Sequence, residues 1–274
     1  MKSSTVDKVV ILARGLGTRM RRQDDAAAVD AQQAAMAASG VKALISVGRP
    51  FLDYVLTVLA ETGYRRVCLV VGPEHDVIRD YYGRQVRPRH LTLDFAVQEK
   101  PRGTADAVAA AEAFADGEPV VVLNSDNYYP AEALTALRAA AGPAVALFDR
   151  QSMLRGSNIA EERLRQFAVA EVDGQGFLAR ILEKPDAALL ASLPQPILLG
   201  MNCWRFGPAI FTACRAIGPS ARGELELPDA VQYAKDMLGE QFRALTIHAP
   251  VLDLSNRRDI AAVAERLSGR EVRF

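Results

Sequence analysis

The chain has 274 residues, half of them hydrophobic, which is enough for one large α/β domain with a full core. Its 33 basic and 33 acidic residues balance, so nucleic acid is not expected as a partner. No apolar run approaches the ~20 residues that span a bilayer, so no membrane association is expected either. Three cysteines without C-x-x-C spacing predict reduced thiols in a cytoplasmic protein.

Short apolar runs alternate with helical patterns through residues 1–150. Strands are predicted at 8–13, 66–71, 91–97, 119–123 and 144–148, and helices at 51–62, 74–82, 103–115 and 130–140. A repeated strand-then-helix order predicts an α/β fold with a mixed, mainly parallel, Rossmann-like sheet between helices. Ligands bind such open sheets beyond the carboxyl ends of the strands.

The pattern changes in residues 151–274. It predicts a β-hairpin of strands 167–172 and 177–182, then an apolar stretch at 196–206 and helices at 207–216, 228–237 and 257–267. We expect this half to extend the same sheet, partly antiparallel, within a single domain that covers residues 1–274. Residues 21–41 fit neither pattern, and a solvent-facing helix, a mobile flap and an inert surface insertion are the alternatives for them.

The loop after the first strand predicts a phosphate site. Gly15 and Gly17 allow a sharp bend that turns backbone N–H groups toward an anion, and Arg19 adds a planar cation suited to phosphate. The spacing decides against two familiar glycine loops. The dinucleotide fingerprint needs a third glycine where this chain has Met20, and the other phosphate loop needs Gly-Lys-Ser/Thr where this chain has Gly17-Thr18-Arg19. A tight turn with no ligand is the alternative.

Two aspartates follow apolar strands in a manner typical of metal ligands. Asp126 lies in Asn124-Ser125-Asp126-Asn127 after the strand at 119–123, and Asp253 ends the apolar run 250–252. Two carboxylates delivered from strand ends can share one Mg²⁺ with phosphate oxygens. Helix capping is the alternative role for each aspartate.

Two further segments favour binding of a base and of a sugar phosphate. Gln98 ends a predicted strand, and its amide can donate and accept at once, as the imide edge of uracil or thymine requires. Gly103, at the start of the next helix, would let a base lie close to the backbone. Glu183 could accept hydrogen bonds from sugar hydroxyls, and the adjacent Lys184 could provide a cation for a sugar phosphate. A surface polar residue and a surface ion pair are the alternatives.

Taken in order, these segments resemble those of the sugar-1-phosphate nucleotidylyltransferases, most closely the glucose-1-phosphate thymidylyltransferase and uridylyltransferase branch. The resemblance covers nearly the whole chain, through residues 12–20, 42–52, 98–107, 124–127, 183–185 and 222–226. It implies the nucleotide-diphospho-sugar transferase (GT-A-like) fold, with a nucleotide-binding half at 1–150 and a sugar-binding half at 151–274. The chain departs from the family pattern at Arg14, where a small residue is usual, at Ala168, at Ser255-Asn256, and in the length of the segment 21–41.

The resemblance implies a reaction in which a sugar-1-phosphate oxygen attacks the α-phosphorus of UTP or dTTP and releases pyrophosphate, with Mg²⁺ as cofactor. The catalytic residues that it implies are Arg19 for pyrophosphate, Lys42 for the α-phosphate, Lys184 for the sugar phosphate, and Asp126. The nucleotide contacts are Leu12, Ala13, Gly15, Gly17, Thr18, Arg19, Gln98, Gly103 and Thr104. The sugar contacts are Asn127, Glu183, Lys184, Asn202 and Glu224, and the metal ligands are Asp126 and Asp253.

Three other functions are weighed against this one. They are a nucleotide-sugar sensor or regulatory domain with little turnover, a nucleotidyltransferase for a phosphorylated acceptor other than glucose, and a metal-dependent glycosyltransferase. The last would need an Asp-x-Asp-like pair, which Ser125-Asp126-Asn127 does not supply. A nucleoside triphosphate and a sugar 1-phosphate are the expected partners. Homo-oligomer formation is left open.

Overall fold

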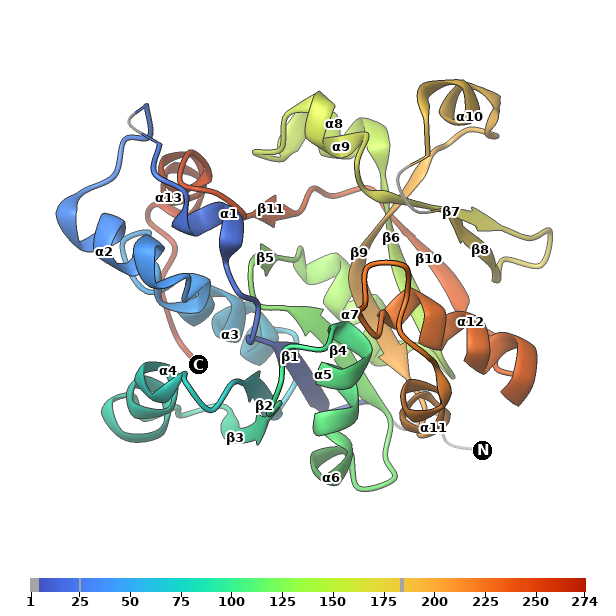
Figure 1. Cartoon of the computed structure of the whole chain (residues 1–274), viewed down its shortest axis with the longest axis horizontal. Helices are drawn as coiled ribbons and strands as arrows, with labels where there is room; N and C mark the ends of the chain where they lie inside the picture. Colours follow the sequence, from blue (N-terminus) through green and yellow to red (C-terminus); the bar gives the residue numbers. More distant parts are fainter. Residues whose placement is uncertain (1–4, 25, 183–184) are drawn as a thin grey trace.

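A central mixed sheet runs through both halves of the chain in the computed structural model, which describes residues 5–24, 26–182 and 185–274 (Figure 1). Nine strands within these residues form the sheet, in the order β10-β6-β9-β4-β1-β2-β3, with β7 paired to β9 and β8 to β7. Their bounds are β1 Lys8–Leu12, β2 Arg66–Val71, β3 Thr92–Val97, β4 Val120–Asn124, β6 Ala144–Asp149, β7 Ala168–Val172, β8 Leu178–Leu182, β9 Leu198–Phe206 and β10 Arg243–Ile247.

The sheet is parallel except around β9 and the hairpin. Strand β1 pairs in parallel with β2 and β4, whereas β9 pairs antiparallel with β4, β6 and β7. Every residue of β1 is buried, as expected for a parallel strand covered on both faces. Val9 and Ile11 belong to one apolar cluster and Val10 and Leu12 to the other, because successive side chains point to opposite faces. The predicted fold class is therefore confirmed.

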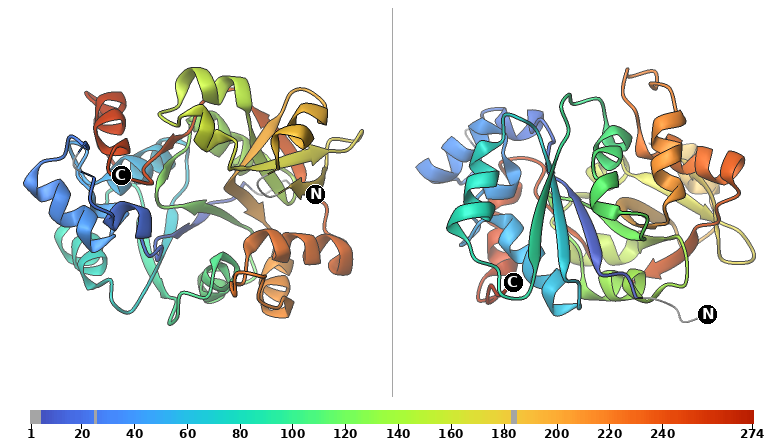
Figure 2. Two further views of the ribbon diagram at one scale, coloured as in Figure 1. Left: turned by 45° about the horizontal axis from the view of Figure 1, so that its top comes forward. Right: turned by 90° about the horizontal axis from the view of Figure 1, so that it is seen from below.

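Helices cover both faces of the sheet (Figures 1 and 2). One face carries α3 Phe51–Glu61, α7 Ala131–Ala139 and α13 Asp259–Leu267, whose apolar residues join the first cluster. The other carries α5 Thr104–Ala110, α6 Glu112–Ala115, α11 Ala209–Ala216 and α12 Leu227–Leu238. None of the described helices is long and apolar enough to cross a membrane.

The remaining elements are short and surround the ends of the sheet. They are α1 Thr18–Arg21, α2 Ala31–Ser39, the 3₁₀-helix Lys42–Leu44, α4 Asp76–Asp80, the π-helix Tyr81–Gln85, α8 Arg150–Gly156, α9 Glu161–Leu164, α10 Ala187–Ser192, and the paired strands β5 Asn127–Tyr128 and β11 Leu252–Asp253.

Two predicted helices differ from the structure in their extent. The helix predicted at 74–82 is α4 followed by a π-helix, and the one predicted at 103–115 is interrupted at Ala111. β10 is absent from the predicted elements; it pairs in parallel with β6, meets Phe177 through a single bridge at Arg243, and is half exposed. An edge strand of this kind lacks the continuous apolar run by which buried strands are recognised.

The segment 21–41 forms a largely solvent-facing helix, one of the predicted alternatives, and it contacts the glycine-bearing loop. Asp30 and Gln33 cap the start of α2 reciprocally, and Gly40 ends it with φ 78°. A Cβ on Gly17 would lie 2.4 Å from the carbonyl oxygen of Gly40. The end of this segment therefore packs directly against the loop that the sequence analysis assigned to phosphate.

The three cysteines are free and buried. Burial raises the pKa of the Cys68 and Cys214 thiols to about 12 and that of Cys203 well above its usual value, so all three stay protonated as core side chains.

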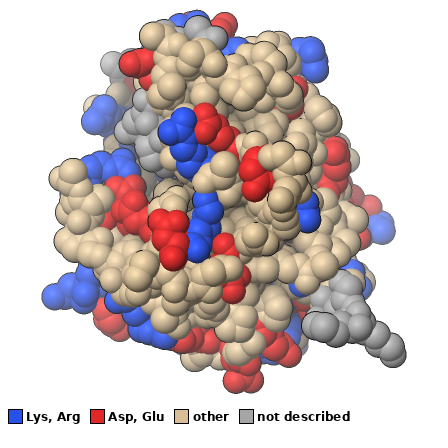
Figure 3. All heavy atoms as spheres, turned by 90° about the vertical axis from the view of Figure 1, so that its right-hand side faces the viewer, with Lys and Arg blue, Asp and Glu red and all other residues tan. Residues whose placement is uncertain are grey.

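On the surface, basic and acidic side chains are interspersed over the face that carries α12 and β8 (Figure 3). Ion pairs near these elements join Arg180 to Glu171 and Arg222 to Glu226.

Candidate active site

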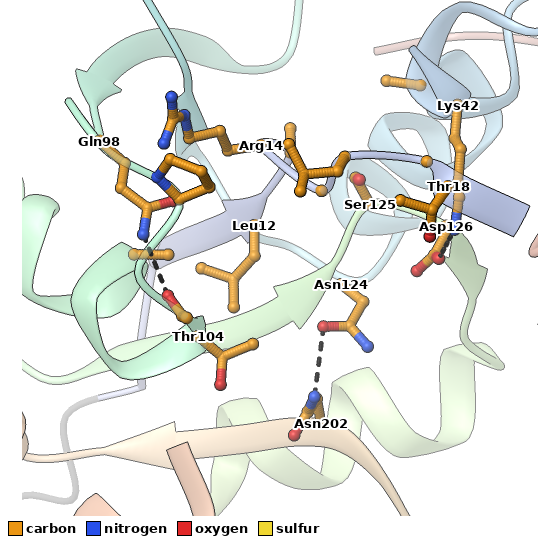
Figure 4. A pocket seen from close by; sticks show the side chains of 18 of the residues that line it. Leu12, Arg14, Thr18, Lys42, Gln98, Thr104, Asn124, Ser125, Asp126 and Asn202 are labelled. Atoms are coloured by element: carbon orange, nitrogen blue, oxygen red, sulfur yellow. Dashed lines mark hydrogen bonds and ion pairs between the residues drawn. The ribbon is translucent and has the colours of Figure 1, made fainter. Parts of the chain in front are cut away.

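A cavity of about 440 Å³ opens at the carboxyl ends of β1 and β4 (Figure 4). Its wall contains all but one of the predicted nucleotide contacts, namely Leu12, Ala13, Gly15, Gly17, Thr18, Gln98, Gly103 and Thr104. Lys42, Asp126, Asn202 and Glu224 also line it. The structure therefore brings together residues that lie more than two hundred positions apart in the chain.

A second cavity, of about 310 Å³, adjoins the first and shares Thr104, Asn124, Asn202 and Glu224 with it. Arg19 lines this second cavity rather than the first, and Asn127 contributes from β5. Of the five predicted sugar contacts, these two cavities contain Asn127, Asn202 and Glu224. Glu183 and Lys184 lie outside the described residues.

The glycine-bearing loop is held from two sides. Gly17 has φ 60° and begins α1, whose Met20 is fully buried. Arg257 donates from Nε to the carbonyl of Met20 at 3.1 Å, and Gly40 packs against Gly17 from the other side. Because glycine takes a positive φ at little cost, Gly17 permits this conformation of the loop.

Lys42 and Asp126 form an ion pair in the wall of the first cavity, with 2.7 Å between Nζ and Oδ2. Their side chains are 18 % and 23 % exposed. Lys42 comes from the 3₁₀-helix after the inserted segment and Asp126 from the turn after β4. The backbone carbonyl of Asp126 accepts a hydrogen bond from the N–H of Leu254, which ties the turn to β11.

Asp253 lies beside this turn because β11 pairs with β5, which sets Asp253 opposite Asn127. Its Oδ1 accepts from Asn127 Nδ2 at 3.0 Å and from the Ser255 hydroxyl at 2.9 Å, and its Oδ2 pairs with Arg163. Burial, and next the charge of Asp126, raise the pKa of Asp253 to about 6. The charge of Asp126 therefore acts on the carboxyl group of Asp253.

The residues that hold Asp253 in position were not among the predicted site residues. Arg163, on α9, also pairs with Asp259 at 2.6 Å. Asn158 exchanges two hydrogen bonds of 2.8 Å with the backbone of Asp253. Both residues lie in a polar stretch with the composition of an ordinary surface helix, so no sequence signal distinguished them.

Gln98 is buried and has a fixed orientation. Its Nε2 donates to the Gly103 carbonyl at 3.0 Å and to Asp106 Oδ2 at 2.8 Å, and since both partners are acceptors the amide nitrogen must face them. Oε1 is then the atom of this amide that has no hydrogen-bond partner among the described residues. The structure adds a second reason for glycine at position 103, because a Cβ there would lie 2.4 Å from the Leu225 carbonyl oxygen; the close approach of a base to Gly103 stays a prediction. The missing side chain makes room for Leu225 in this structure.

Asn202 enters the cavity from a β-bulge. The pairing of β9 with β6 shifts between Val145 and Leu147, and Asn202 takes φ 50°, a left-handed conformation that asparagine tolerates better than most residues. The bulge turns its amide toward Asn124, with 3.5 Å between Nδ2 and Oδ1. The two amides span the boundary between the two cavities.

Solved structures share this fold. A UDP-glucose pyrophosphorylase complexed with UDP-glucose superposes with a TM-score of 0.73 at 15% identity over 97% of this chain and 100% of that one. The UTP-bound UGPase from Acinetobacter baumannii gives 0.74 at 16% identity over 97% and 95%. Fold and cavities therefore define an α/β protein with the architecture of the UDP-glucose pyrophosphorylases.

Sequence comparison gives the family. A model described as nucleotidyl transferase matches residues 36–247, and this chain belongs to that family. The glucose-1-phosphate thymidylyltransferase of Streptomyces griseus is 30% identical over 93% of this chain and 64% of its own length. The UTP–glucose-1-phosphate uridylyltransferase AglF of Haloferax volcanii is 25% identical over 95% and 96%.

The chain spans only part of some relatives. It covers 56% of the low-salt glycan biosynthesis nucleotidyltransferase Agl11 of Haloferax volcanii, to which it is 28% identical over 82% of its own residues. The predicted resemblance to the sugar-1-phosphate nucleotidylyltransferases is confirmed by these matches.

Proposed function

We propose that the chain transfers a nucleotidyl group from UTP or dTTP to a sugar 1-phosphate, which yields a nucleotide sugar and pyrophosphate. The observation that carries the proposal is the pair of adjoining cavities, one lined by Gln98 and the glycine-bearing loop and the other by Asn127 and Glu224. The names of the relatives, which act on glucose 1-phosphate with thymidylyl or uridylyl donors, support the same substrate classes.

In this proposal the nucleoside triphosphate occupies the first cavity. Its base meets Gln98, and its phosphates follow the loop of residues 15–18, where backbone N–H groups can donate to phosphate oxygens. Lys42 supplies an ammonium at the α-phosphate, with Asp126 holding that ammonium in place at 2.7 Å. Such fixed charges stabilise a phosphoryl-type transition state without rearranging during the reaction.

The sugar 1-phosphate occupies the second cavity, beside the amides of Asn127 and Asn202 and the carboxylate of Glu224. One of its anionic oxygens bonds to the α-phosphorus while the bond from that phosphorus to the pyrophosphate oxygen breaks. No protein base is required, because the attacking oxygen carries no proton. Although Arg19 lines the second cavity, it directly follows the loop of residues 15–18, and we assign its exposed guanidinium, which forms no ion pair with any described residue, to the departing pyrophosphate.

Mg²⁺ is the proposed cofactor, and two carboxylates would hold it: Asp126, in the wall of the first cavity, and Asp253, which lines neither cavity and already bonds to Asn127, Ser255 and Arg163. Asp253 is a buried carboxylate whose pKa is raised by burial and by the charge of Asp126, and a divalent cation would relieve both effects. No cluster of three or more His, Cys, Asp or Glu side chains forms within the described part of the chain, so phosphate and water would complete the ligand set. When bound, the ion neutralises charge on the triphosphate.

The experiment is a matrix of nucleoside triphosphates against sugar 1-phosphates with MgCl₂, scored by product mass and pyrophosphate release. We expect a nucleotide sugar from UTP or dTTP with at least one hexose 1-phosphate. An Asp126→Ala variant measured in parallel should form little product, because it lacks one of the proposed metal ligands. Tight binding of UTP without turnover of any sugar phosphate would instead identify a sensor domain.

A further inference from the structure

We propose that Arg163 competes with the divalent cation for Asp253, so that the cation binds this carboxylate only after the guanidinium has left it. The inference rests on the proposed function, which makes Asp253 a metal ligand. Asp253 lines neither cavity and its side chain is 5 % exposed, whereas Arg163 lines the second cavity and is 27 % exposed. The arginine is therefore the accessible member of this ion pair.

Arg163 stands between the second cavity and the carboxylate. The side chain of Asp253 bonds to Asn127, Ser255 and Arg163. Two of these partners, Asn127 and Arg163, also line the second cavity. An ion that enters from this cavity therefore meets an amide and a positive charge before it meets Asp253.

The two oxygens of the Asp253 carboxylate are engaged differently. Oδ1 accepts from the amide of Asn127 at 3.0 Å and from the hydroxyl of Ser255 at 2.9 Å, which are both neutral donors. Oδ2 is paired with Nη2 of Arg163 and with no other described residue. A metal ion at Oδ2 would be repelled by the charge of the adjacent guanidinium. The guanidinium and the cation are thus alternative partners of this oxygen.

Asp253 has enough other contacts to keep its place without Arg163. Its backbone exchanges two hydrogen bonds of 2.8 Å with the side chain of Asn158. Strand β11 pairs with β5 at this residue, and Oδ1 keeps its two neutral donors. Departure of the guanidinium would therefore leave the carboxylate in position, with Oδ2 open to an ion.

Arg163 has a second carboxylate that can retain it. Its Nη1 donates to Oδ1 of Asp259 at 2.6 Å. Asp259 is fixed at the start of α13, because its Oδ2 accepts from the backbone N–H groups of Ser255 and Asn256, each at 2.9 Å. The guanidinium can turn away from Asp253 and still keep this counterion. Its charge is then not left unpaired in the wall of the cavity.

The test measures binding of Mn²⁺, the probe for the divalent site, to the full chain by electron paramagnetic resonance. The titration is made without nucleotide at about pH 8, so that Asp253 is ionised. In Arg163→Gln no hydrogen bond from a charged donor has to be broken for the ion to bind. We therefore expect Mn²⁺ to bind this variant about tenfold more tightly than the native chain.

Arg165→Gln is the matched control. It removes a positive charge two residues away, but Arg165 pairs with Glu161 at 3.1 Å and is 55 % exposed. Its affinity for Mn²⁺ should stay native, which separates local competition from a general change in charge. In the background of Asp253→Asn, the change Arg163→Gln should bring no gain, because the oxygen for which the two cations compete is no longer a carboxylate oxygen.

If Arg163→Gln does not fold, Arg163→Met serves in its place, since it keeps an aliphatic side chain of similar length without the charge. An affinity for Mn²⁺ that is unchanged or lower in a folded Arg163 variant overturns the inference, because removal of a residue that merely supports Asp253 would weaken binding. A native chain that binds neither Mn²⁺ nor UTP overturns the proposed function instead.

Discussion

The ammonium of Lys42 lies 2.7 Å from the carboxylate of Asp126, so the segment after the insertion and the end of β4 meet in a single ion pair. Each member offsets the charge of the other and lies in the wall of the cavity. A phosphate or a metal ion that enters must therefore engage a pair that is already in position. Preorganisation of this kind is a large part of how enzymes stabilise developing charge.

Asp126→Ala should lower kcat for pyrophosphate release by roughly a hundredfold or more, as loss of one preorganised electrostatic group often does. The measurement is a coupled pyrophosphate assay at saturating substrates, with circular dichroism to verify folding. Asp76→Ala, which removes an exposed aspartate paired with Arg79, is the control and should retain the native rate. An unchanged kcat in the Asp126 variant would remove this residue from the mechanism.

Gln98→Ala should weaken the preference for UTP over CTP, because Oε1 is the atom that would accept from N3–H. We expect the ratio of kcat/KM values for the two nucleotides to fall by about tenfold, with a smaller loss of kcat than in Asp126→Ala. Asp106→Asn, which alters a partner of the Gln98 amide but leaves Oε1 in place, distinguishes recognition from packing. Base preference that survives in Gln98→Ala speaks against the assigned pose.

Gly17→Ala should destabilise the chain, since Gly17 has φ 60° and a Cβ there would lie 2.4 Å from the Gly40 carbonyl oxygen. The conformational strain alone costs about 1 kcal/mol or more, which corresponds to a fall in Tm of about 2–4 °C for a chain of this size. Gly15→Ala is the matched control, because a Cβ at that position would have no neighbouring atom within 4 Å and its φ lies outside the left-handed region. Equal Tm values for the two variants would contradict the packing described for Gly17.

The stability of the chain without divalent cations should carry a pH dependence from Asp253. Its folded-state pKa, about 6, lies above the ordinary 3.8, so the folded chain binds this proton more tightly than the unfolded chain. The stabilising contribution is therefore present below the ordinary pKa and is lost as the pH rises through about 6, by roughly 3 kcal/mol at most.

Urea unfolding of the native chain and of Asp253→Asn between pH 4 and pH 7 tests this dependence. The asparagine keeps the size of the side chain but does not titrate, so the difference in unfolding free energy between the two proteins isolates the carboxylate. The native chain should lose stability relative to the variant as the pH rises. A constant difference would mean that the pKa of Asp253 is the same in the folded and the unfolded chain.

The central strands β1, β2 and β4 could be predicted because their sequences are nearly continuous apolar runs. β1 and β4 are buried on both faces, and that burial is evident from residues such as Val9, Val10 and Val121. β5 and β11 have two residues each and exist only through their mutual pairing, so neither leaves a periodic signal. The edge strand β10 was missed for a related reason, since its exposed side leaves it half polar.

The site could be predicted as a set of motif residues but not as a network. Gln98, Asp126 and Asp253 each follow an apolar segment, which marks them as groups at one edge of the sheet. Arg163 and Asn158 carry no such mark, because their role depends on a fold that brings them to Asp253 from about ninety residues away. The reason for Gly103 was equally hidden, since Leu225 approaches it from more than a hundred positions later.

The hydrogen bond between Asn127 and Asp253 joins residues 126 positions apart. During synthesis on the ribosome, the first half of the chain can begin to fold before residue 253 has been made. Asp126 and Asp253 therefore cannot come together at that stage. Until the segment that contains residue 253 has been synthesised and has docked, the growing chain holds Asp126 with its neighbouring lysine but without its second carboxylate. The contacts that hold Asp253 thus form late in biosynthesis, after most of the scaffold.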